Sequence, residues 1–371
     1  MDNNRLLCLE DFEEQAQKLL PISAWSYYSS GADNEETLRE NREAYRRYWL
    51  KPRILRDVSV IDISTSVLGE KVDAPICISP TAFHCKAHSD GEIATCKGAA
   101  DMNTLMTLSS ISNKSLEEVA AARPNSPKWQ NVYPLRHRDI TKDIVKRAER
   151  AGFKAVVMSV DIPTGGFKRR AVRISGQTVF PDEYFGNLDR YINKTARSSP
   201  DIPQVDDPID VSLGDPKSAW EYIDWLKTVT KLPIVLKGIL TVEDAILAAE
   251  HNVQGILVSN HGGRQLDCVP APIDALSNIV DAVGDKLEVY VDGGIRTGTD
   301  VLKALALGAR AVFIGRPVLY GLACNGEEGV KAVLRILREE FIRAMALTGC
   351  CRLSDISKAV LVSRSDVLSK L

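Results

Sequence analysis

Residues 288–316 read EVYVDGGIRTGTDVLKALALGARAVFIGR and contain a complete strand–helix–strand unit. The apolar, β-branched runs at Glu288–Val291 and Ala311–Ile314 predict two strands, and the amphipathic stretch at Thr299–Leu307 predicts the helix between them. Short strands that alternate with helices in this way are typical of βα units joined in a parallel sheet. The segment therefore predicts an α/β fold.

The same alternation extends through most of the chain. Eight strands are expected, at Pro75–Ser79, Thr104–Leu108, Gln130–Tyr133, Ala155–Val160, Ile234–Lys237, Gly255–Ser259, Glu288–Val291 and Ala311–Ile314. The helices are expected near Gly91–Met102, Ser115–Ala122, Lys142–Ala151, Ala219–Thr230, Val242–His251, Ile273–Val283, Thr299–Leu307 and Gly326–Leu347. Eight such units predict a TIM (β/α)8 barrel, which needs about 250 residues.

The rest of the 371 residues is expected as additions to one domain, residues 1–371. Residues 1–70 are expected to form an N-terminal helical segment, beginning with a helix at Leu9–Leu20 that stops at Pro21. The barrel is expected at residues 71–350 and a C-terminal tail at 351–371. Residues 164–216, after the fourth strand, are expected as a long loop; loops of this length are typically lids or binding loops, and a disordered insertion is the alternative.

Composition excludes several classes of protein. There are 47 Lys and Arg against 49 Asp and Glu, and this net charge of −2 argues against a nucleic-acid partner. No apolar run approaches the roughly 18 residues of a membrane span, and residues 1–5 lack the apolar stretch of a signal peptide. The eight cysteines form no CxxC pair and the five histidines no HExxH motif, so we expect reduced thiols and no bound metal.

Charged residues gather at the predicted strand exits, where barrels of this kind carry their active sites. Turn formation explains the glycines and some aspartates there. It does not explain why Lys237, His261, Arg264, Arg296 and Arg316 all occupy such positions. These five side chains are therefore candidate functional residues.

The exits of the last two strands predict a phosphate site. Asp292-Gly293-Gly294-Ile295-Arg296 and Gly315-Arg316 combine glycines, which let backbone N–H groups approach an anion, with two guanidinium groups. Surface salt bridges are the alternative. The chain has neither a GxxxxGK[ST] run nor a clean GxGxxG, which favours a mononucleotide-type phosphate over a dinucleotide.

His261 and Lys237 are the candidates for chemistry. His261 can act as a general base, and Arg264 three residues later can bind a carboxylate; a structural histidine in a turn is the alternative. Lys237 at the end of the fifth strand could form a Schiff base, face an electron-rich cofactor, or extend its ammonium to the barrel rim. His84 and His88 are weaker candidates.

Together these motifs resemble the FMN-dependent 2-hydroxy acid oxidase family over essentially the whole chain. The most specific stretch is Ser259-Asn260-His261-Gly262-Gly263-Arg264-Gln265-Leu266-Asp267, followed by Asp292-Gly293-Gly294-Ile295-Arg296. The resemblance implies that FMN lies across the barrel mouth. It implies that the flavin and its ribityl phosphate contact Pro80, Thr81, Ala82, Ser109, Asn131, Ser159, Lys237, Ser259, Asp292, Gly294, Arg296, Gly315 and Arg316.

The resemblance also implies the catalytic roles. His261 would be the base that removes a substrate proton, Asp161 would stabilise its imidazolium, and Lys237 would face the flavin. Arg264 would bind the substrate carboxylate, with Tyr27 and Tyr133 at the substrate oxygens. The resemblance leaves hydride transfer and a carbanion route both open.

Three positions depart from the family pattern. Ile111 stands where the family usually has a large group and should reshape the substrate pocket. Lys168 stands at the second carboxylate-binding arginine, with Arg169 adjacent, and a lysine is a point charge instead of a planar fork. Asn131 stands at a flavin-binding glutamine; Gln130 would take that place only if a residue were inserted.

The last three residues, Ser369-Lys370-Leu371, match a peroxisomal targeting signal. They predict a partner, the peroxisomal import receptor, and a peroxisomal location. This suits an oxidase that releases hydrogen peroxide. The resemblance adds the expectation of a homo-oligomer, a tetramer or an octamer.

These observations predict an FMN-dependent (S)-2-hydroxy acid oxidase that acts on a small 2-hydroxy acid and O2. A dehydrogenase with another electron acceptor is the nearest alternative; since no haem-binding segment precedes the expected barrel, oxygen is favoured. A Schiff-base aldolase using Lys237 would leave His261 and Arg264 unexplained. A catalytically impaired FMN-binding relative is the third alternative, motivated by Ile111, Lys168 and Asn131.

Overall fold

The computed structural model describes residues 6–176, 184–192 and 214–363. Eight parallel strands close into a barrel in the order β10-β11-β4-β5-β6-β7-β8-β9, which confirms the predicted TIM barrel. The strands are β4 (Ile76–Ile78), β5 (Met106–Leu108), β6 (Lys128–Val132), β7 (Ala155–Ser159), β8 (Ile234–Ile239), β9 (Gly255–Val258), β10 (Glu288–Asp292) and β11 (Ala311–Ile314).

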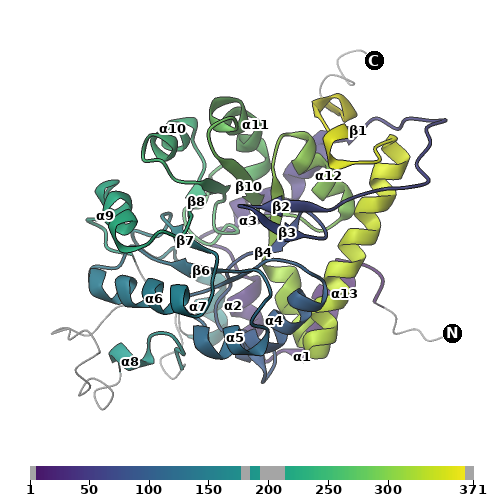
Figure 1. The fold of residues 1–371 in the computed structure, drawn as a ribbon. Coiled ribbons are helices and arrows are strands. Elements are labelled where there is room, and N and C mark those ends of the chain that lie inside the picture. Colours follow the sequence, from purple (N-terminus) through teal and green to yellow (C-terminus); the bar gives the residue numbers. More distant parts are fainter. Residues whose placement is uncertain (1–5, 177–183, 193–213, 364–371) are drawn as a thin grey trace.

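Helices surround the barrel, as Figure 1 shows. They are α4 (Gly91–Asp101), α5 (Leu116–Ala122), α6 (Arg138–Arg150), α9 (Glu221–Val229), α10 (Val242–Glu250), α11 (Pro272–Val283), α12 (Gly298–Ala306) and α13 (Arg316–Thr348). One predicted start was wrong, since helix α6 begins at Arg138 instead of Lys142. The span α13 consists of two helical stretches separated by non-helical backbone at Asn325 and Gly326, and the helix expected at Gly326–Leu347 corresponds to the second stretch.

The barrel interior is filled and is not a pore. Side chains of successive strand residues point alternately inward and outward, and the inward-facing Trp129, Tyr290 and Phe313 form an aromatic cluster with ring centroids 5.4–5.7 Å apart. Phe313 also lines the cavity at the carboxyl end of the strands. The aromatic cluster therefore supports the floor of that cavity.

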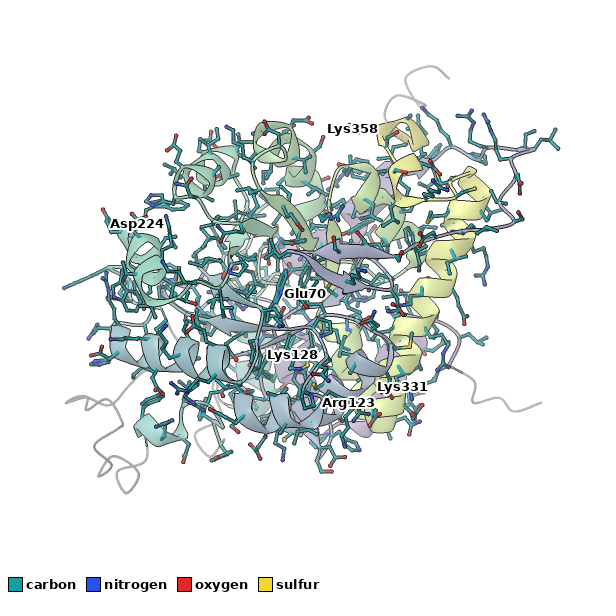
Figure 2. All side chains as sticks on the ribbon, in the orientation of Figure 1. Glu70, Arg123, Lys128, Asp224, Lys331 and Lys358 are labelled. Atoms are coloured by element: carbon teal, nitrogen blue, oxygen red, sulfur yellow. The ribbon has the colours of Figure 1, made fainter. Side chains whose placement is uncertain are left out.

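The opposite, amino-terminal end of the barrel is covered by a hairpin. Strands β2 (Thr65–Val67) and β3 (Glu70–Val72) pair antiparallel, and Figure 1 shows them in front of the barrel. At this end the buried Lys128 donates hydrogen bonds to the carbonyl oxygens of Arg123 (2.5 Å) and Ser126 (2.8 Å). Figure 2 shows Arg123 and Lys128 close together there.

The N-terminal segment covers the carboxyl end of the barrel and meets the tail. It contains α1 (Leu9–Leu19), α2 (Ile22–Ser29), α3 (Glu36–Glu43), η1 (Ala44–Arg47) and β1 (Tyr48–Leu50). In Figure 1, α2 and α3 are fainter because they lie on the far side from the hairpin. The tail is more ordered than a loop: it forms η4 (Leu353–Asp355), η5 (Lys358–Val360) and β12 (Leu361–Ser363), and β12 pairs antiparallel with β1.

The insertion after the fourth barrel strand contains helices, where a long loop was expected. These are α7 (Arg169–Ser175) and α8 (Asp189–Ile192). Residues 177–183 and 193–213 of the insertion lie outside the described residues, as do residues 369–371. All eight cysteines are free thiols. Within the described residues, no helix is long and apolar enough to span a membrane.

Candidate active site

A cavity of about 570 Å³ opens at the carboxyl end of the barrel strands. Helices α2 and α3 contribute to its wall together with the strand exits. The structure brings sixteen of the predicted site residues to this cavity: Tyr27, Pro80, Thr81, Ala82, Ser109, Ile111, Tyr133, Lys168, Lys237, His261, Arg264, Asp292, Gly294, Arg296, Gly315 and Arg316.

Three of the predicted flavin contacts lie beneath the wall instead of in it. Asn131 Nδ2 donates to Ser159 Oγ at 3.1 Å, and Lys237 Nζ donates to Ser259 Oγ at 3.0 Å. The side chains of Asn131, Ser159 and Ser259 are all buried. Inside the barrel, the Asn131 amide donates to the Val157 carbonyl oxygen of the next strand. The Gln130 amide donates instead to the carbonyl oxygens of Leu108 and Asn131. Asn131 is therefore the amide that faces the barrel interior.

His261 and Asp161 form the acid–base pair of the site. His261 Nδ1 lies 3.0 Å and 3.1 Å from the two carboxylate oxygens of Asp161. Because a carboxylate only accepts hydrogen bonds, Nδ1 is the donor, and the lone pair of a neutral imidazole is then on Nε2. His261 lines the cavity with a positive φ of 58°, a backbone conformation that non-glycine residues seldom adopt. His261 can therefore act as a base through Nε2, with its ring orientation fixed by the Asp161 carboxylate.

Burial and charge set the ionisation of this pair. Burial lowers the pKa of His261, and the attraction of Asp161 offsets this only in part. Burial alone would raise the pKa of Asp161, but the nearby His261 and Lys237 outweigh it, so the net pKa of Asp161 is lowered. Burial raises the pKa of Tyr133 well above its usual range. At neutral pH the pair is therefore neutral imidazole with carboxylate, and Tyr133 is a neutral hydroxyl.

Lys237 is paired with a carboxylate. Its Nζ lies 3.7 Å from Asp292 Oδ2, which also accepts a 3.0 Å hydrogen bond from Ser79 Oγ. An ammonium held by a carboxylate is not the free amine that Schiff-base formation requires. The buried Asp292 Oδ1 has no hydrogen-bond partner among the described residues, although Asp292 lines the cavity. An acceptor is thus available to a hydroxyl in the cavity.

One side of the cavity carries two cations beside the acid–base pair. Arg264 Nη1 donates to the carbonyl oxygens of Tyr27 (2.6 Å) and Ser30 (3.0 Å), and its guanidinium lies 4.8 Å from the centre of the Tyr27 ring. Lys168, which precedes α7, lines the same cavity, whereas Arg169 pairs with Asp33. Lys168, and not the adjacent Arg169, is therefore the residue that lines the cavity at the position where the family pattern has its second carboxylate-binding arginine.

Three arginines gather at the other end of the cavity. Arg42, Arg296 and Arg316 all line it, and Glu13 is the carboxylate within ion-pair distance of Arg42 and Arg296. Burial, with repulsion from neighbouring guanidiniums, lowers the pKa of Arg296 and lowers that of Arg316 to about 10. Arg316 is also the first residue of α13, whose N-terminal dipole favours an anion. This excess of buried positive charge suits a phosphate.

The polar residues of the 259–267 stretch fasten the N-terminal segment over the barrel. Asn260 and Asn41 exchange side-chain hydrogen bonds of 2.7 and 2.9 Å. The Asp267 carboxylate accepts from the backbone N–H groups of Asn34 (3.0 Å) and Thr37 (2.8 Å) at the start of α3. A Cβ at Gly294, where φ is 83°, would lie 1.7 Å from the Asn41 carbonyl oxygen, so this glycine is needed for the close approach of α3.

Apolar side chains form a further part of the cavity wall. Phe83 packs against Tyr27 and Phe185, with ring centroids 5.6 and 5.5 Å apart, and Ile111 lies in the same wall. Phe185 comes from the insertion after β7. Its segment is held by Asn187, which accepts from Leu116 N at 2.7 Å and donates to Ser112 Oγ at 2.8 Å.

Several cavity residues were missed from the sequence. Asn41 and Arg42 belong to a highly charged helix whose sequence carries no signal that it covers a barrel, and Phe185 lies in the insertion, where neither a helix nor a strand was expected. Ser79 could have been found, since it directly precedes Pro80 at a strand exit. His84 is buried away from the cavity, with its ring nitrogens 2.6 and 2.9 Å from Thr81 and Thr95 hydroxyls, so it is structural.

The barrel, the acid–base pair and the anion-binding end define a flavin-dependent class of enzyme, and the chain belongs to the FMN-dependent dehydrogenase family. The model of that family matches residues 16–363.

Among its relatives, 2-hydroxyacid oxidase 1 of Homo sapiens is 47% identical over 371 residues, 99% of each chain. The peroxisomal (S)-2-hydroxyacid oxidase GLO4 of Arabidopsis thaliana is 46% identical over 355 residues, 96% of each chain. A solved structure of a mandelate oxidase mutant with (S)-mandelic acid aligns with a TM-score of 0.86 at 36% identity, covering 97% of this chain and 99% of that one.

The cavity residues fit the FMN that the family description names. A volume of about 570 Å³ lies within the range of cofactor pockets. The arginine end supplies charge for the phosphate, and the unpartnered Asp292 Oδ1 supplies an acceptor for a hydroxyl of the ribityl chain. Both features lie in one continuous cavity with His261.

Proposed function

We propose that the protein is an (S)-2-hydroxy acid oxidase, which converts a 2-hydroxy acid into the 2-oxo acid while O2 becomes hydrogen peroxide. The observation that carries the proposal is the His261–Asp161 pair, which shares a cavity with two carboxylate-attracting cations and an arginine-rich anion site. The names of relatives in Homo sapiens and Arabidopsis thaliana support the same reaction.

In this proposal the cavity residues bind the substrate and accept its proton. Arg264 and Lys168 bind the substrate carboxylate, and Tyr27 and Tyr133 contact its oxygens. Neutral His261 accepts a proton on Nε2, and Asp161 stabilises the imidazolium that results. The substrate side chain lies against the apolar wall that includes Ile111.

The cofactor is held by the rest of the cavity. FMN, when bound, supplies the two-electron acceptor that O2 regenerates. Arg296, Arg316 and Gly315 hold its phosphate, and Asp292 holds the ribityl chain. Pro80, Thr81, Ala82, Ser109, Lys237 and Gly294 contact the bound group directly, whereas Asn131, Ser159 and Ser259 support it from the layer beneath.

The test is release of hydrogen peroxide when small 2-hydroxy acids are added to the purified flavin-loaded protein in air. His261→Gln should reduce the rate by about 10²–10⁴-fold while FMN stays bound, because the base is lost and the phosphate site is not. Fast reduction of an artificial acceptor without peroxide would assign the dehydrogenase activity instead. FMN binding with no turnover of any acid would identify an impaired relative.

We propose a peroxisomal location, supported by Ser369-Lys370-Leu371 and by the name of the Arabidopsis thaliana relative. The partner is the peroxisomal import receptor. A fluorescent fusion that keeps residues 369–371 at its carboxyl end should enter peroxisomes, and deletion of these three residues should leave it in the cytosol. Identical distributions of the two fusions would contradict the proposal.

We also propose a homo-oligomer, a tetramer or an octamer. Ile54 and Leu55 are 82% and 100% exposed in the connection after β1, and large apolar side chains in contiguous exposed positions mark interaction surfaces. Light scattering after size exclusion should give a multiple of the chain mass of 40.8 kDa. Replacement of both side chains by Ser should shift the mass downward; a monomeric wild type would refute the assembly.

A further inference from the structure

Three successive cations precede or begin helix α7 and have different partners. Arg169 Nη2 lies 2.9 Å from Asp33 Oδ1, and Arg170 Nε lies 2.9 Å from Glu35 Oε1. The side chain of Lys168 makes no ion pair or hydrogen bond with any described residue and lines the cavity instead. The two arginines thus fasten α7 to the connection before α3, and Lys168 is left to the cavity.

The backbone around Lys168 is fixed. The Phe167 carbonyl oxygen accepts from Asp33 N at 2.8 Å, and Gly166 N donates to Gln265 Oε1 at 3.1 Å. A Cβ at Gly166 would lie 2.3 Å from the Arg264 carbonyl oxygen, so the backbone that precedes Lys168 packs directly against the backbone of Arg264. Lys168 is therefore held beside Arg264 by contacts on both sides.

No carboxylate among the described residues forms an ion pair with this lysine, and Arg264 is the charged group that acts on it. The charged groups that line the cavity with it at the strand exits are Lys237, His261 and Arg264. The nearby carboxylates are those of Asp161, Asp33 and Glu35. The Asp161 carboxylate is hydrogen-bonded to His261, and those of Asp33 and Glu35 are ion-paired with the adjacent Arg169 and Arg170. The half-buried Lys168 ammonium faces the repulsion of Arg264 instead.

Building on the proposed function, we propose that Lys168 is a proton-dependent second cation of the carboxylate site. It takes up a proton from solvent when a 2-hydroxy acid binds at neutral or alkaline pH, so this chain binds its acid more weakly as the pH rises. An arginine at the same position would stay charged and would give no such dependence.

The direction of the pH dependence follows from the linkage between proton binding at Lys168 and binding of the carboxylate. Burial, with the charge of Arg264, lowers the pKa of Lys168 to about 7. Below that pH the lysine is already charged; above it the free protein must gain a proton before the cation can attract the carboxylate. The bound carboxylate raises the pKa again, so the dissociation constant should rise about tenfold per pH unit until the pKa of the complex is reached. His261, with its pKa below the usual value, is already neutral in this range.

The test uses 2-hydroxy-2-methylpropanoate, which has the carboxylate and the hydroxyl but no hydrogen on the carbon to be oxidised. Its binding to the flavin-loaded protein is followed by the change in flavin absorbance. From about pH 7 to about pH 9 the wild-type dissociation constant should rise at least tenfold. K168R should bind tightly with a flat profile, and K168M should bind weakly with a flat profile. A wild-type profile parallel to that of K168R would overturn the proposal.

Calorimetry of the wild-type protein in two buffers of different ionisation enthalpy gives a second measurement that needs no variant. At about pH 8.5, binding should take up about one proton per ligand, and an uptake of zero would overturn the proposal. Since the ligand is not turned over, this outcome is separate from the proposed activity. Peroxide release together with a flat profile would reject the role of Lys168 alone.

Discussion

At the scale of single residues, the position of a buried charge along its strand determines what it can do. Lys128 at the start of β6 and Lys237 in β8 are both almost fully buried. Lys128 donates to backbone carbonyls at the closed end of the barrel, whereas Lys237 lines the cavity and lies 3.7 Å from Asp292. The first lysine stabilises the fold, and the second is available to a ligand.

Asp161 should control the pH dependence of the reaction. The rate requires neutral His261, whose pKa is lowered by burial, so on the acid side kcat/KM should fall only below the usual range of a histidine pKa. Asp161→Asn removes the attraction that raises the pKa of His261. The acid limb should therefore move to lower pH, and the plateau should fall because the imidazolium loses its counter-charge. An acid limb that moves to higher pH would contradict this role.

Arg316 should account for much of the FMN affinity. Arg316→Met removes a buried cation from the phosphate end and should weaken FMN binding by about 10–100-fold, as expected for loss of a charge-assisted hydrogen bond. The control is Arg335→Met, which removes an exposed arginine from the same helix, α13. Fluorescence titration of the apoprotein with FMN measures both. Equal affinities of the two variants would place the phosphate elsewhere.

At the scale of elements, the site depends on segments outside the barrel. Helix α3 brings Asn41 and Arg42 to the cavity, and the segment before α8 brings Phe185. Gly186, next to Phe185, sits so close to the backbone of residues 113–115 that an added Cβ would lie 2.5 Å from it. The insertion thus packs tightly on the loop between β5 and α5.

Phe185 should set part of the preference for the substrate side chain. Phe185→Ala removes one ring of the apolar wall and should lower kcat/KM for a long-chain 2-hydroxy acid by about tenfold relative to glycolate, since about 0.8 kcal/mol is lost per methylene no longer buried. Tyr184→Ala is the matched control, because Tyr184 is the adjacent aromatic residue and is exposed. A similar loss for both acids would mean that the ring stabilises the site and does not select.

At this scale the sequence predicts the barrel well and its additions poorly. Strands such as β9 and β11 repeat a short apolar pattern between turn residues, so their ends were predicted within one residue. Helix α7 was not predicted, because its residues 169–175 are stabilised by ion pairs to Asp33 and Glu35 that no local pattern reveals. In contrast, the helix boundary expected at Gly326 corresponds to non-helical backbone at Asn325 and Gly326, which separates the two helical stretches of α13.

At the scale of the whole molecule, the N-terminal segment covers the carboxyl end of the barrel and also pairs with the C-terminal tail. Helices α2 and α3 cover it, and β1 pairs with β12 of the tail. Motifs at strand exits could be predicted because the barrel places all of them on one face. The contributions of Arg42 and Phe185 could not, because they depend on how distant segments pack over that face.

FMN should stabilise this assembly as a unit. A ligand at 100 times its dissociation constant adds about 2.7 kcal/mol to the free energy of unfolding. Because α2 and α3 contribute directly to the cavity, hydrogen exchange in residues 22–43 should slow when FMN binds. The β2–β3 hairpin at the opposite end is the internal control and should change less. Protection confined to the hairpin would contradict FMN binding at the carboxyl end.

The most direct test of the central claim, that one cavity holds FMN and a base aimed at a 2-hydroxy acid, is an anaerobic titration of the flavin-loaded protein. The (S)-enantiomer of a 2-hydroxy acid should bleach the visible flavin absorbance, and admission of oxygen should restore it with release of an equal amount of hydrogen peroxide. The His261→Gln variant should keep its colour under the same treatment. Undiminished flavin absorbance in the wild-type protein with every acid in a series of chain lengths would contradict the claim.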